Sequence, residues 1–270
     1  MVPPGPPDEG GPRLARELQE RAARALPAAH VELLGSWWLR HSPGCAWWVG
    51  SVLPHGEAAA ADLPAMVAAA EAFSAARGAA TTFQVCPGAC PAGLDRVLAA
   101  RRYRRHTPMS LQAAAVADVL ARLTAGAPDG HAAGRHDVHL EERPAEDWWA
   151  VWRAGIHHGE GASRAAEERL LARVTAPSAF ARATAGGEPV SIARAVADTG
   201  WSGVFDVVTL PHARGRGAAS AVLAALARWA KSQGCSGLYL QVERDNAAAL
   251  RLYARAGFRE VAAYHYRERL

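Results

Sequence analysis

The sequence lacks the long apolar segments that mark membrane and exported proteins. No apolar run in its 270 residues approaches the roughly 20 residues that a membrane span needs. The N-terminal stretch MVPPGPPDEGGPR has no basic segment followed by an apolar core, so it does not resemble a signal peptide. We expect residues 1–12 to form a disordered tail. These absences predict a cytoplasmic protein with no membrane partner.

Cysteine is scarce, and its spacing does not indicate a metal site. The four cysteines are Cys45, Cys86, Cys90 and Cys235. Cys86 and Cys90 are separated by three residues, and neither a second close pair nor a His-x-x-x-His pattern follows. We therefore expect reduced structural thiols, with neither a disulfide framework nor a bound metal.

Excess charge is also small, with a formal net charge of +4. The positive charge is nearly all arginine and alanine is abundant, which is typical of a GC-rich bacterial gene. This balance is compatible with anionic small ligands but does not predict a nucleic-acid partner. Half of the residues are hydrophobic and 21% are charged, so the chain can bury a sizeable core in one or two domains.

Helix and strand patterns alternate along the whole chain, which predicts an α/β or α+β fold. Helices are expected over 14–26, 63–77, 92–102, 145–154, 164–174, 217–233 and 247–256. Strands are expected over 80–85, 103–113, 136–144, 180–185, 189–197, 203–210, 237–243 and 258–266. The runs VELLGSWWLR and CAWWVGSVLP flank the turn signal HSPG and predict a hairpin.

The Gly/Ala/Pro-rich stretch LTAGAPDGHAAGR is the best linker candidate. It divides the chain into an N-terminal domain, 13–124, a linker, 125–135, and a C-terminal domain, 136–270. The two parts echo each other, because FQV followed by AGLDRVLAARRY resembles LQV followed by AAALRLYARAGF. This echo predicts an internal duplication.

Glycines and arginines gather at one joint between a predicted strand and a predicted helix, DVVTLPHARGRGAASAVLAALARWA. Gly215 and Gly217 lie where the helix begins, and its first turn leaves backbone N–H groups unpaired. Glycine lets an anion approach those amides, and Arg214 and Arg216 add positive charge. The joint is therefore a candidate phosphate site.

Other interpretations of this joint are weaker. A Walker loop requires Gly-Lys-Ser/Thr, which is missing, and Ser220 stands where a dinucleotide fingerprint needs its third glycine. A glycine-containing turn without a ligand is the structural alternative.

The segment PHARGRGAAS resembles the acetyl-CoA pyrophosphate loop of the GCN5-related N-acetyltransferases (GNAT), with Arg214, Gly217 and Ala219 in the three positions that define it. Downstream, LQVERDNAAALRLYARAGF resembles the second signature of that family. The resemblance covers about the last 135 residues. It implies a mixed, mostly antiparallel, splayed sheet flanked by helices, duplicated in tandem.

The resemblance also implies acetyl transfer from acetyl-CoA to a primary amine. The residues that it places at the cofactor are Val207, Val208, Thr209, Arg214, Gly215, Arg216, Gly217, Ala218, Ala219, Ser220 and Asn246. Tyr253 stands where the family keeps the hydroxyl that protonates the CoA thiolate, so it is the candidate general acid. A core tyrosine is the alternative.

The general base is less well defined by the sequence. Glu243 ends the strand beside the expected cofactor, and Glu160 lies in the segment GIHHGEG, where members of the family shape the acceptor pocket. Asp206, His157 and His158 are further candidates. Each has an ordinary structural alternative as an exposed or strand-end polar residue.

The N-terminal part has no such phosphate loop, and alignment of the echo places Leu98 opposite Tyr253. It is interpreted as a degenerate copy that walls the acceptor cleft; an unrelated α+β module is the alternative. Tyr264 and Tyr266, and some of the tryptophans Trp37, Trp38, Trp47, Trp48, Trp148, Trp149 and Trp152, are candidates for lining that cleft or for core packing.

Two classes of function remain at this point: an N-acetyltransferase, and a non-catalytic acyl-CoA-binding regulatory module. The presence of Tyr253 beside the loop favours the enzyme. Its acceptor, a small-molecule amine or a peptide N-terminus, and the acyl length are open, and the last strand could pair in a homodimer.

Overall fold

The protein has a mixed α+β fold built on one long sheet and a small hairpin. The computed structural model describes residues 11–124, 136–155 and 163–269. Within them, an eight-stranded sheet has the order β3-β10-β4-β9-β8-β7-β6-β5, antiparallel except for the β8–β9 pair. Its strands are β3 (Thr82–Val85), β4 (Arg104–Ala115), β5 (Asp137–Glu141), β6 (Ser178–Ala185), β7 (Glu188–Asp198), β8 (Trp201–Thr209), β9 (Gly237–Glu243) and β10 (Arg259–Glu268).

The hairpin consists of β1 (His30–Leu34) and β2 (Trp37–His41). The α-helices are α1 (Gly11–Ala25), α2 (Leu63–Ala75), α3 (Leu94–Ala100), α4 (Val116–Thr124), α5 (Glu146–Gly155), α6 (Arg164–Leu171), α7 (Ala218–Ser232) and α8 (Ala247–Ala256). Two short 3-10 helices are η1 (Trp47–Gly50) and η2 (Pro211–Ala213).

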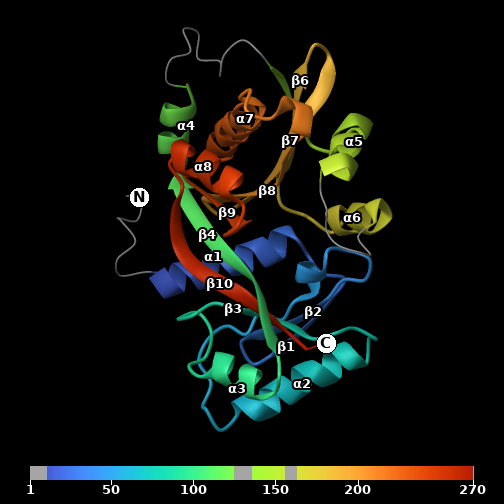
Figure 1. Cartoon of the computed structure of the whole chain (residues 1–270), viewed down its shortest axis with the longest axis vertical. Helices are drawn as coiled ribbons and strands as arrows, with labels where there is room; N and C mark the ends of the chain where they lie inside the picture. The colour runs from blue at the N-terminus through green and yellow to red at the C-terminus, as the bar shows by residue number, and fades with distance from the viewer. Residues whose placement is uncertain (1–10, 125–135, 156–162, 270) are drawn as a thin grey trace.

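Helices cover both faces of the C-terminal part of the sheet (Figure 1). α7 packs on β6, β7 and β8, with α4 and α8 beside it. On the opposite face α5 buries Trp148, Trp149 and Trp152 against Phe180 and Ile192. These three tryptophans are therefore core residues. A sheet that is buried on both faces needs apolar side chains packed against each face, and α5 supplies them on this one.

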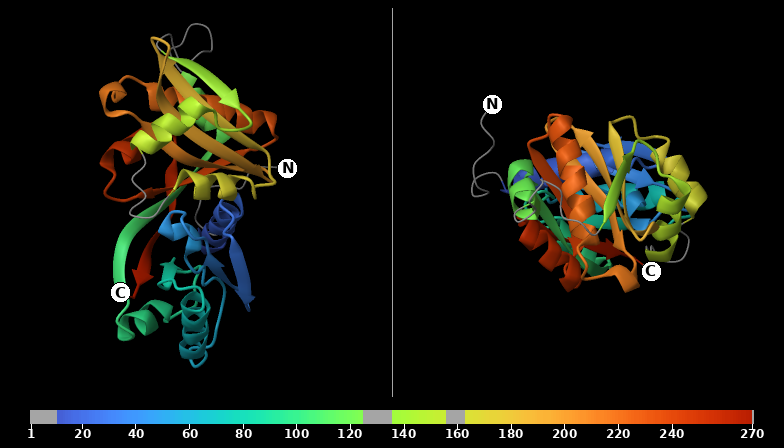
Figure 2. Two further views of the ribbon diagram at one scale, coloured as in Figure 1. Left: turned by 90° about the vertical axis from the view of Figure 1, so that its right-hand side faces the viewer. Right: turned by 90° about the horizontal axis from the view of Figure 1, so that it is seen from above.

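The last strand of each half pairs with the other half. β4 comes from the N-terminal half but pairs with β9, where Met109 lies opposite Glu243. β10 ends the C-terminal half but pairs with β3, where His265 lies opposite Val85. β4 and β10 also pair with each other and run together between the upper and lower parts of the molecule (Figures 1 and 2). The halves are therefore interlocked through a single sheet.

The echo between the halves has a structural counterpart. The Tyr103 N–H donates to the Leu98 carbonyl at 3.0 Å, directly after Arg102 with φ of +66°. The Phe258 N–H donates to the Tyr253 carbonyl at 2.9 Å, directly after Gly257 with φ of +96°. Each half thus closes a helix with a left-handed residue and enters its last strand on an aromatic residue, so Leu98 does occupy the position of Tyr253.

An ionic cluster anchors the exchanged strand β10. Arg267 donates two hydrogen bonds to Asp95 on α3, at 2.8 and 3.0 Å, and His265 lies 2.8 Å from the same carboxylate. A further Arg267 nitrogen donates to the Tyr103 carbonyl at 2.9 Å. This paired arrangement ties the end of the chain to the N-terminal half.

Two local predictions need correction. The two-stranded hairpin lies within VELLGSWWLR, turning at Gly35 with φ of +59°, and Trp47–Gly50 form the 3-10 helix η1. Of the predicted pairing across HSPG, one antiparallel bridge is present, between Trp38 and Leu53. The chain does turn back after HSPG, because Trp38 and Leu53 exchange two backbone hydrogen bonds of 3.0 Å, but η1 occupies the residues that would lengthen this pairing. Helix α4 was not predicted, although Val116, Val119, Leu120 and Leu123 recur at helical spacing and carried a readable signal.

The predicted tail and linker, 1–12 and 125–135, lie wholly or largely outside the described residues. Among the helices that the structure does describe, none has the length and apolar character needed to cross a bilayer.

Replacing Asp95 with asparagine should destabilise the protein by on the order of 1–2 kcal/mol at pH 7, since it weakens charge-assisted bonds at a partly exposed site. Hydrogen bonds from Arg267 and His265 hold the pKa of Asp95 at about 2 despite its partial burial. This stabilisation is present above the ordinary pKa near 4 and is lost as the pH falls toward 2. Urea unfolding near pH 7 and pH 2, with Asp62→Asn on an exposed position as the control, measures it. Equal stability of both variants at pH 7 would contradict the anchoring role.

Candidate active site

The sheet parts between β8 and β9. Their parallel pairing extends only from Trp201 with Gly237 to Gly203 with Tyr239. A Cβ atom at Gly237 would lie 2.4 Å from the Trp201 ring, and one at Gly203 would lie 2.6 Å from a neighbouring aromatic ring. Glycine therefore lets aromatic side chains cross the joined ends of the two strands. Beyond this point the strands separate, as the predicted splayed sheet requires.

A one-residue bulge interrupts β8 beside the gap. Phe205 lies opposite Arg194 and Val208 lies opposite Ile192, so two residues of β8 face one residue of β7. The extra residue is Asp206, whose φ is +54°. A one-residue insertion reverses which face the following side chains occupy.

The free edge of β8 faces the gap. The Leu210 N–H donates to the Val190 carbonyl at 2.9 Å, so the backbone groups of Leu210 and Val208 point toward β7. Strand alternation then directs those of Val207 and Thr209 toward the gap. Both residues are among those that the sequence resemblance places at the cofactor.

The predicted phosphate loop leads directly into α7. Gly215 and Gly217 have φ of +74° and +90°, and nothing lies within 4 Å of a Cβ built on either. Gly217 supplies no side-chain cap, so the first-turn amides of α7 receive no side-chain oxygen. Arg214 is exposed and donates to the Thr209 carbonyl at 3.3 Å, and Arg216 is exposed. This open, positively polarised helix start is a suitable cradle for a phosphate.

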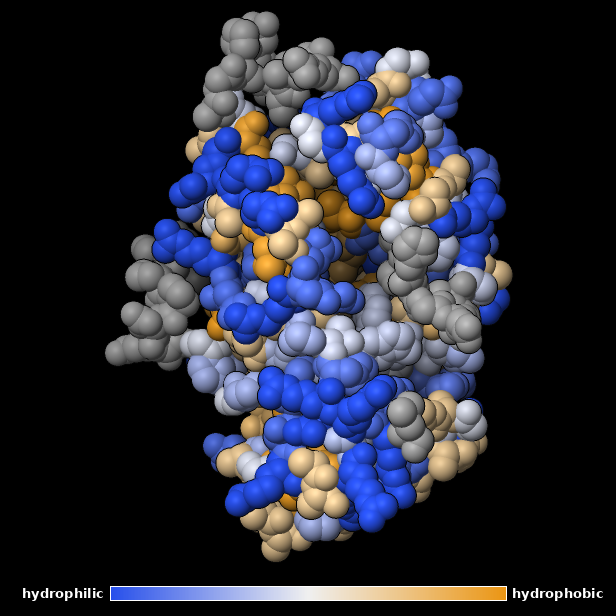
Figure 3. Space-filling model, viewed as in Figure 1, coloured by the Kyte–Doolittle hydropathy of each residue, from blue (hydrophilic) through white to orange (hydrophobic). Residues whose placement is uncertain are grey.

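A cavity of about 390 Å³ occupies the gap. Figure 3 shows an apolar hollow in this upper region of the molecule. Its lining comes from both halves: Leu26, Trp47, Trp48, Thr107 and Met109 from the N-terminal half, and Gly155, Val204–Val208, Gln241–Glu243, Asn246, Ala249, Tyr253, Tyr264 and Tyr266 from the C-terminal half.

The cavity is approached from the two faces of the sheet. Leu240 and Val242 of β9 pack in the core beneath α7, as does Tyr253 of α8. Gln241 and Glu243 therefore project to the opposite face, where Gln241 accepts a hydrogen bond from the Tyr264 hydroxyl. The cavity thus has an α7–α8 side and an opposite side formed with the N-terminal half.

Tyr253 is the hydroxyl on the α7–α8 side. Its ring packs edge-on against Phe258 at 5.8 Å, and it is 6% exposed. Burial raises the pKa of Tyr253 well above the ordinary value, so it is a neutral proton donor at pH 7. Among the described residues it has no hydrogen-bond partner, which leaves the hydroxyl available to a ligand in the cavity.

Two acidic residues line the cavity, and they differ in their partners. Asp206 accepts a 3.0 Å hydrogen bond from Arg194, which is 1% exposed and also contacts the Phe205 ring. Glu243 lies at the rim with no cationic partner among the described residues, and partial burial together with the charge of Asp245 raises its pKa. Glu243 is therefore the freer of the two carboxylates.

A third carboxylate, close to Asp206 and Arg194, was not among the residues predicted from the sequence. Glu167 on α6 accepts a hydrogen bond from the Ala46 backbone; burial and the negative charge of Asp206 raise its pKa to about 7, against the opposing effect of Arg194. Adjacent Glu168 is exposed, and no pattern in the sequence distinguishes the two. Only the docking of α6 on the loop before η1 buries Glu167.

The remaining predicted residues fall into three groups. Glu160, His157 and His158 lie outside the described residues. Asn246 lines the cavity, and its side chain also caps α8 by accepting from the Ala249 N–H at 3.1 Å. Trp47, Trp48, Tyr264 and Tyr266 reach the cavity, whereas Trp37 is buried in a separate core.

The four thiols are unpaired, and burial raises the pKa of each. The described residues contain no cluster of three or more side chains suited to a metal ion.

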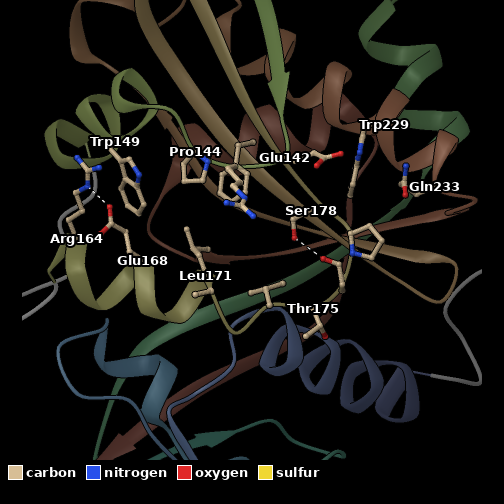
Figure 4. A pocket seen from close by; sticks show the side chains of 16 residues that line it. Glu142, Pro144, Trp149, Arg164, Glu168, Leu171, Thr175, Ser178, Trp229 and Gln233 are labelled. Carbon is tan, nitrogen blue, oxygen red and sulfur yellow. Dashed lines mark hydrogen bonds and ion pairs between the residues drawn. The ribbon is translucent and has the colours of Figure 1, made fainter.

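A larger cavity of about 810 Å³ lies elsewhere, between α6 and the end of α7 (Figure 4). Arg164 and Glu168 stand at one end, and Trp229 and Gln233 at the other. Arg164 is bound to Glu168 and Glu146, so its charge is already compensated. None of the residues lining this cavity belongs to the glycine loop or to the gap between β8 and β9, so it is separate from the candidate site.

Comparison with known proteins agrees with this geometry. Residues 141–258 match the sequence model of the acetyltransferase (GNAT) family, which spans the glycine loop, the parted strands and Tyr253. Residues 141–258 are thus similar in sequence to the GNAT family. This similarity agrees with the acetyl-CoA-dependent N-acetyltransferase that the two sequence signatures predict.

Similar proteins extend the match beyond the GNAT signatures. The chain is 26% identical over 260 residues to "Uncharacterized N-acetyltransferase YobR" of Bacillus subtilis (strain 168), covering 93% of this chain and 97% of that protein. Its fold resembles that of a GCN5-related N-acetyltransferase from Kribbella flavida, with a TM-score of 0.67 and 18% identity over 96% and 95% of the two chains. A tandem GNAT protein from the clavulanic acid biosynthesis pathway has a similar fold, with a TM-score of 0.62 and 14% sequence identity. The match covers 100% of this chain and 90% of that one.

Substituting Glu167 with glutamine should stabilise the protein at pH 8. The folded state raises the pKa of Glu167 from 4.5 to about 7, so ionisation disfavours folding increasingly as the pH rises through that interval. Glutamine can still accept from Ala46 but carries no charge. We expect a gain on the order of 1–2 kcal/mol at pH 8 and little change at pH 5.

Thermal unfolding at both pH values measures this effect, with exposed Glu168→Gln as the matched control. A loss of stability at pH 8 in the Glu167 variant would show that the carboxylate is charged and favourably paired there.

Proposed function

We propose that this protein transfers an acetyl group from acetyl-CoA directly to a primary amine across the gap between β8 and β9. The observation that carries the proposal is the two-sided cavity, with Tyr253 reaching it from the α7–α8 side and Glu243 from the opposite side. A thioester and an amine that enter from opposite faces would meet in the gap, which aligns them for reaction.

The cofactor would be held mainly by the backbone. The amides of Gly215–Ser220 at the start of α7 suit the pyrophosphate, and Arg214 and Arg216 add charge beside it. The free edge at Val207 and Thr209 would pair with the amides of the pantetheine arm as an added strand does. Asn246 lies on the same lining, beyond the end of β9.

Proton transfers complete the reaction. Glu243, directly or through water, would take a proton from the bound ammonium, and the amine lone pair would then attack the thioester carbonyl. The gap-facing N–H of Val207 would stabilise the developing oxyanion. When the C–S bond breaks, Tyr253 would donate its proton to the leaving thiolate. The second proton of the attacking nitrogen would pass through solvent to the Tyr253 phenolate, and Glu243 would release the first to solvent, leaving a neutral amide and a thiol.

The two halves would divide these tasks. We propose that residues 136–270 carry the cofactor site and that residues 13–124 form a degenerate copy without chemistry. Leu98, fully buried in the N-terminal core, stands in the position of Tyr253 and has no proton to donate. The N-terminal half instead contributes Trp47, Trp48 and Met109 to the acceptor side.

The cofactor site is tested by isothermal titration of acetyl-CoA. Gly217→Glu should abolish measurable binding, because it places a carboxylate at the proposed pyrophosphate site. Gly187→Glu is the matched control: its φ is +86° and its Cβ position is equally open, but it lies in the β6–β7 turn. Both variants carry similar backbone strain, so equal loss of binding would assign the effect to strain rather than to the site.

Tyr253→Phe should lower kcat by roughly 10- to 1,000-fold, the range for loss of a general acid, while acetyl-CoA affinity stays within about threefold. The packing of the ring against Phe258 is retained in this variant, so the change isolates the hydroxyl. Steady-state kinetics and titration measure the two quantities. Weakened binding with unchanged kcat would instead assign Tyr253 to cofactor positioning.

Glu243→Gln should lower kcat roughly 100-fold at pH 7. Because the pKa of Glu243 is raised, the wild-type kcat should begin to fall at a pH above the ordinary 4.5 as the carboxylate is protonated. The Glu243→Gln variant should not show this fall of kcat at acidic pH. If kcat still falls at acidic pH in Glu243→Gln but no longer does so in Asp206→Asn, Asp206 and not Glu243 is the general base.

A further inference from the structure

The outer end of the reaction cavity has an aromatic wall built from both halves. Trp47 of η1 contacts the Tyr266 ring edge-on at 4.7 Å and the His106 ring at 5.1 Å. Tyr264 and Tyr266 contact each other at 5.7 Å. Trp47 is nevertheless 40% exposed, and it is one of the few large apolar side chains that remain so. An aromatic face left open on a cavity is a recognition surface for a ring or a cation.

Only one carboxylate among the described residues that line the cavity is free to bind an ammonium group. Asp206 is neutralised by buried Arg194, whereas Glu243 has no cationic partner among the described residues. Glu243 is therefore the one lining carboxylate free to bind the reacting amine. The cavity lining beyond it offers rings and apolar side chains rather than further acids.

A buried positive charge lies behind the aromatic wall. Arg40 is 6% exposed, and its guanidinium donates to the Ser51 carbonyl at 2.8 Å and to the Ser51 hydroxyl at 3.0 Å. No carboxylate pairs with it among the described residues, and its guanidinium also donates to the Trp48 carbonyl at 3.3 Å, next to Trp47. Burial lowers its pKa to about 10, so it stays charged at neutral pH. This charge disfavours a second ammonium at the outer end.

We propose that the acceptor is a small primary monoamine carried on a flat aromatic body, with Trp47 as the residue that selects it. The inference rests on the proposed acetyltransferase function and names the substrate class of that site. The ammonium would lie at Glu243, and the ring would lie against Trp47 and Tyr266. A cavity of about 390 Å³ that also receives the thioester end suits a small molecule.

Three amines test the class, with thiol release as the readout. 2-Phenylethylamine represents it, 4-(2-aminoethyl)benzylamine adds a second ammonium to the same ring, and spermidine is a polycation without a ring. We expect kcat/KM to be highest for 2-phenylethylamine and at least about tenfold lower for each of the other two. Preference for spermidine or for the diamine would overturn the proposed class.

Trp47→Ala tests the selecting residue. It should raise the KM for 2-phenylethylamine at least about tenfold and change kcat less than about threefold, with Trp47→Phe recovering most of the loss. The matched control is Trp229→Ala, which removes a half-buried tryptophan from the other cavity and should leave this KM unchanged. An equal change in KM in both tryptophan variants, or an unchanged KM in Trp47→Ala, would overturn the assignment.

Binding measurements separate failure of this inference from failure of the proposed function. Acetyl-CoA titration into each variant shows that the cofactor site has folded, and 2-phenylethylamine is then titrated into the CoA complex. Amine binding that Trp47→Ala weakens, without turnover of any amine, would support the aromatic site and refute the transferase. Acetyl-CoA binding with efficient turnover of spermidine alone would support the transferase and refute the aromatic class.

Discussion

The separation of β8 from β9 is the constraint on which the active site depends. A parallel pair that continued past Gly203 and Tyr239 would satisfy its own backbone groups and leave no space between the strands. Because pairing stops there, the backbone of Val207 and the N–H of Thr209 lie at an edge where a ligand can replace a strand, while the Thr209 carbonyl accepts from Arg214. The same separation opens a passage through the sheet, so two substrates can meet from opposite faces.

The exchange of β4 and β10 gives the N-terminal half its place in the site. β4 pairs with β9 and β10 pairs with β3, so neither half can complete its sheet alone. The exchange brings Met109 and Tyr266 to the reaction cavity and places η1, with Trp47, at its outer end. A half that has no phosphate loop and no hydroxyl in the position of Tyr253 is thereby retained as a wall of the acceptor pocket.

The electrostatic character of the cavity depends on which charged side chains are buried and paired, more than on how many there are. Arg194 compensates Asp206, Glu167 is held with a raised pKa behind them, and Arg40 stays charged without a carboxylate partner among the described residues. Glu243 at the rim is left free. Uncompensated charges in a partly desolvated site act strongly on a ligand, so this pattern favours one positive group near the gap and disfavours a second one farther out.

The sequence by itself determined the local features whose cause is local. The glycines at 215 and 217, the helix stripe after them and the Asn246–Tyr253 segment are short-range patterns, and the structure has a loop, α7 and α8 there. The boundaries of β9 and α8 agree with the prediction residue for residue. Tertiary structure decided what depends on distant partners: the strand exchange, the bulge at Asp206, the burial of Glu167 and the exposure of Trp47. A strand carries no signal of which edge it will join, and a carboxylate carries none of the environment that will shift its pKa, because both depend on packing between residues far apart in the chain.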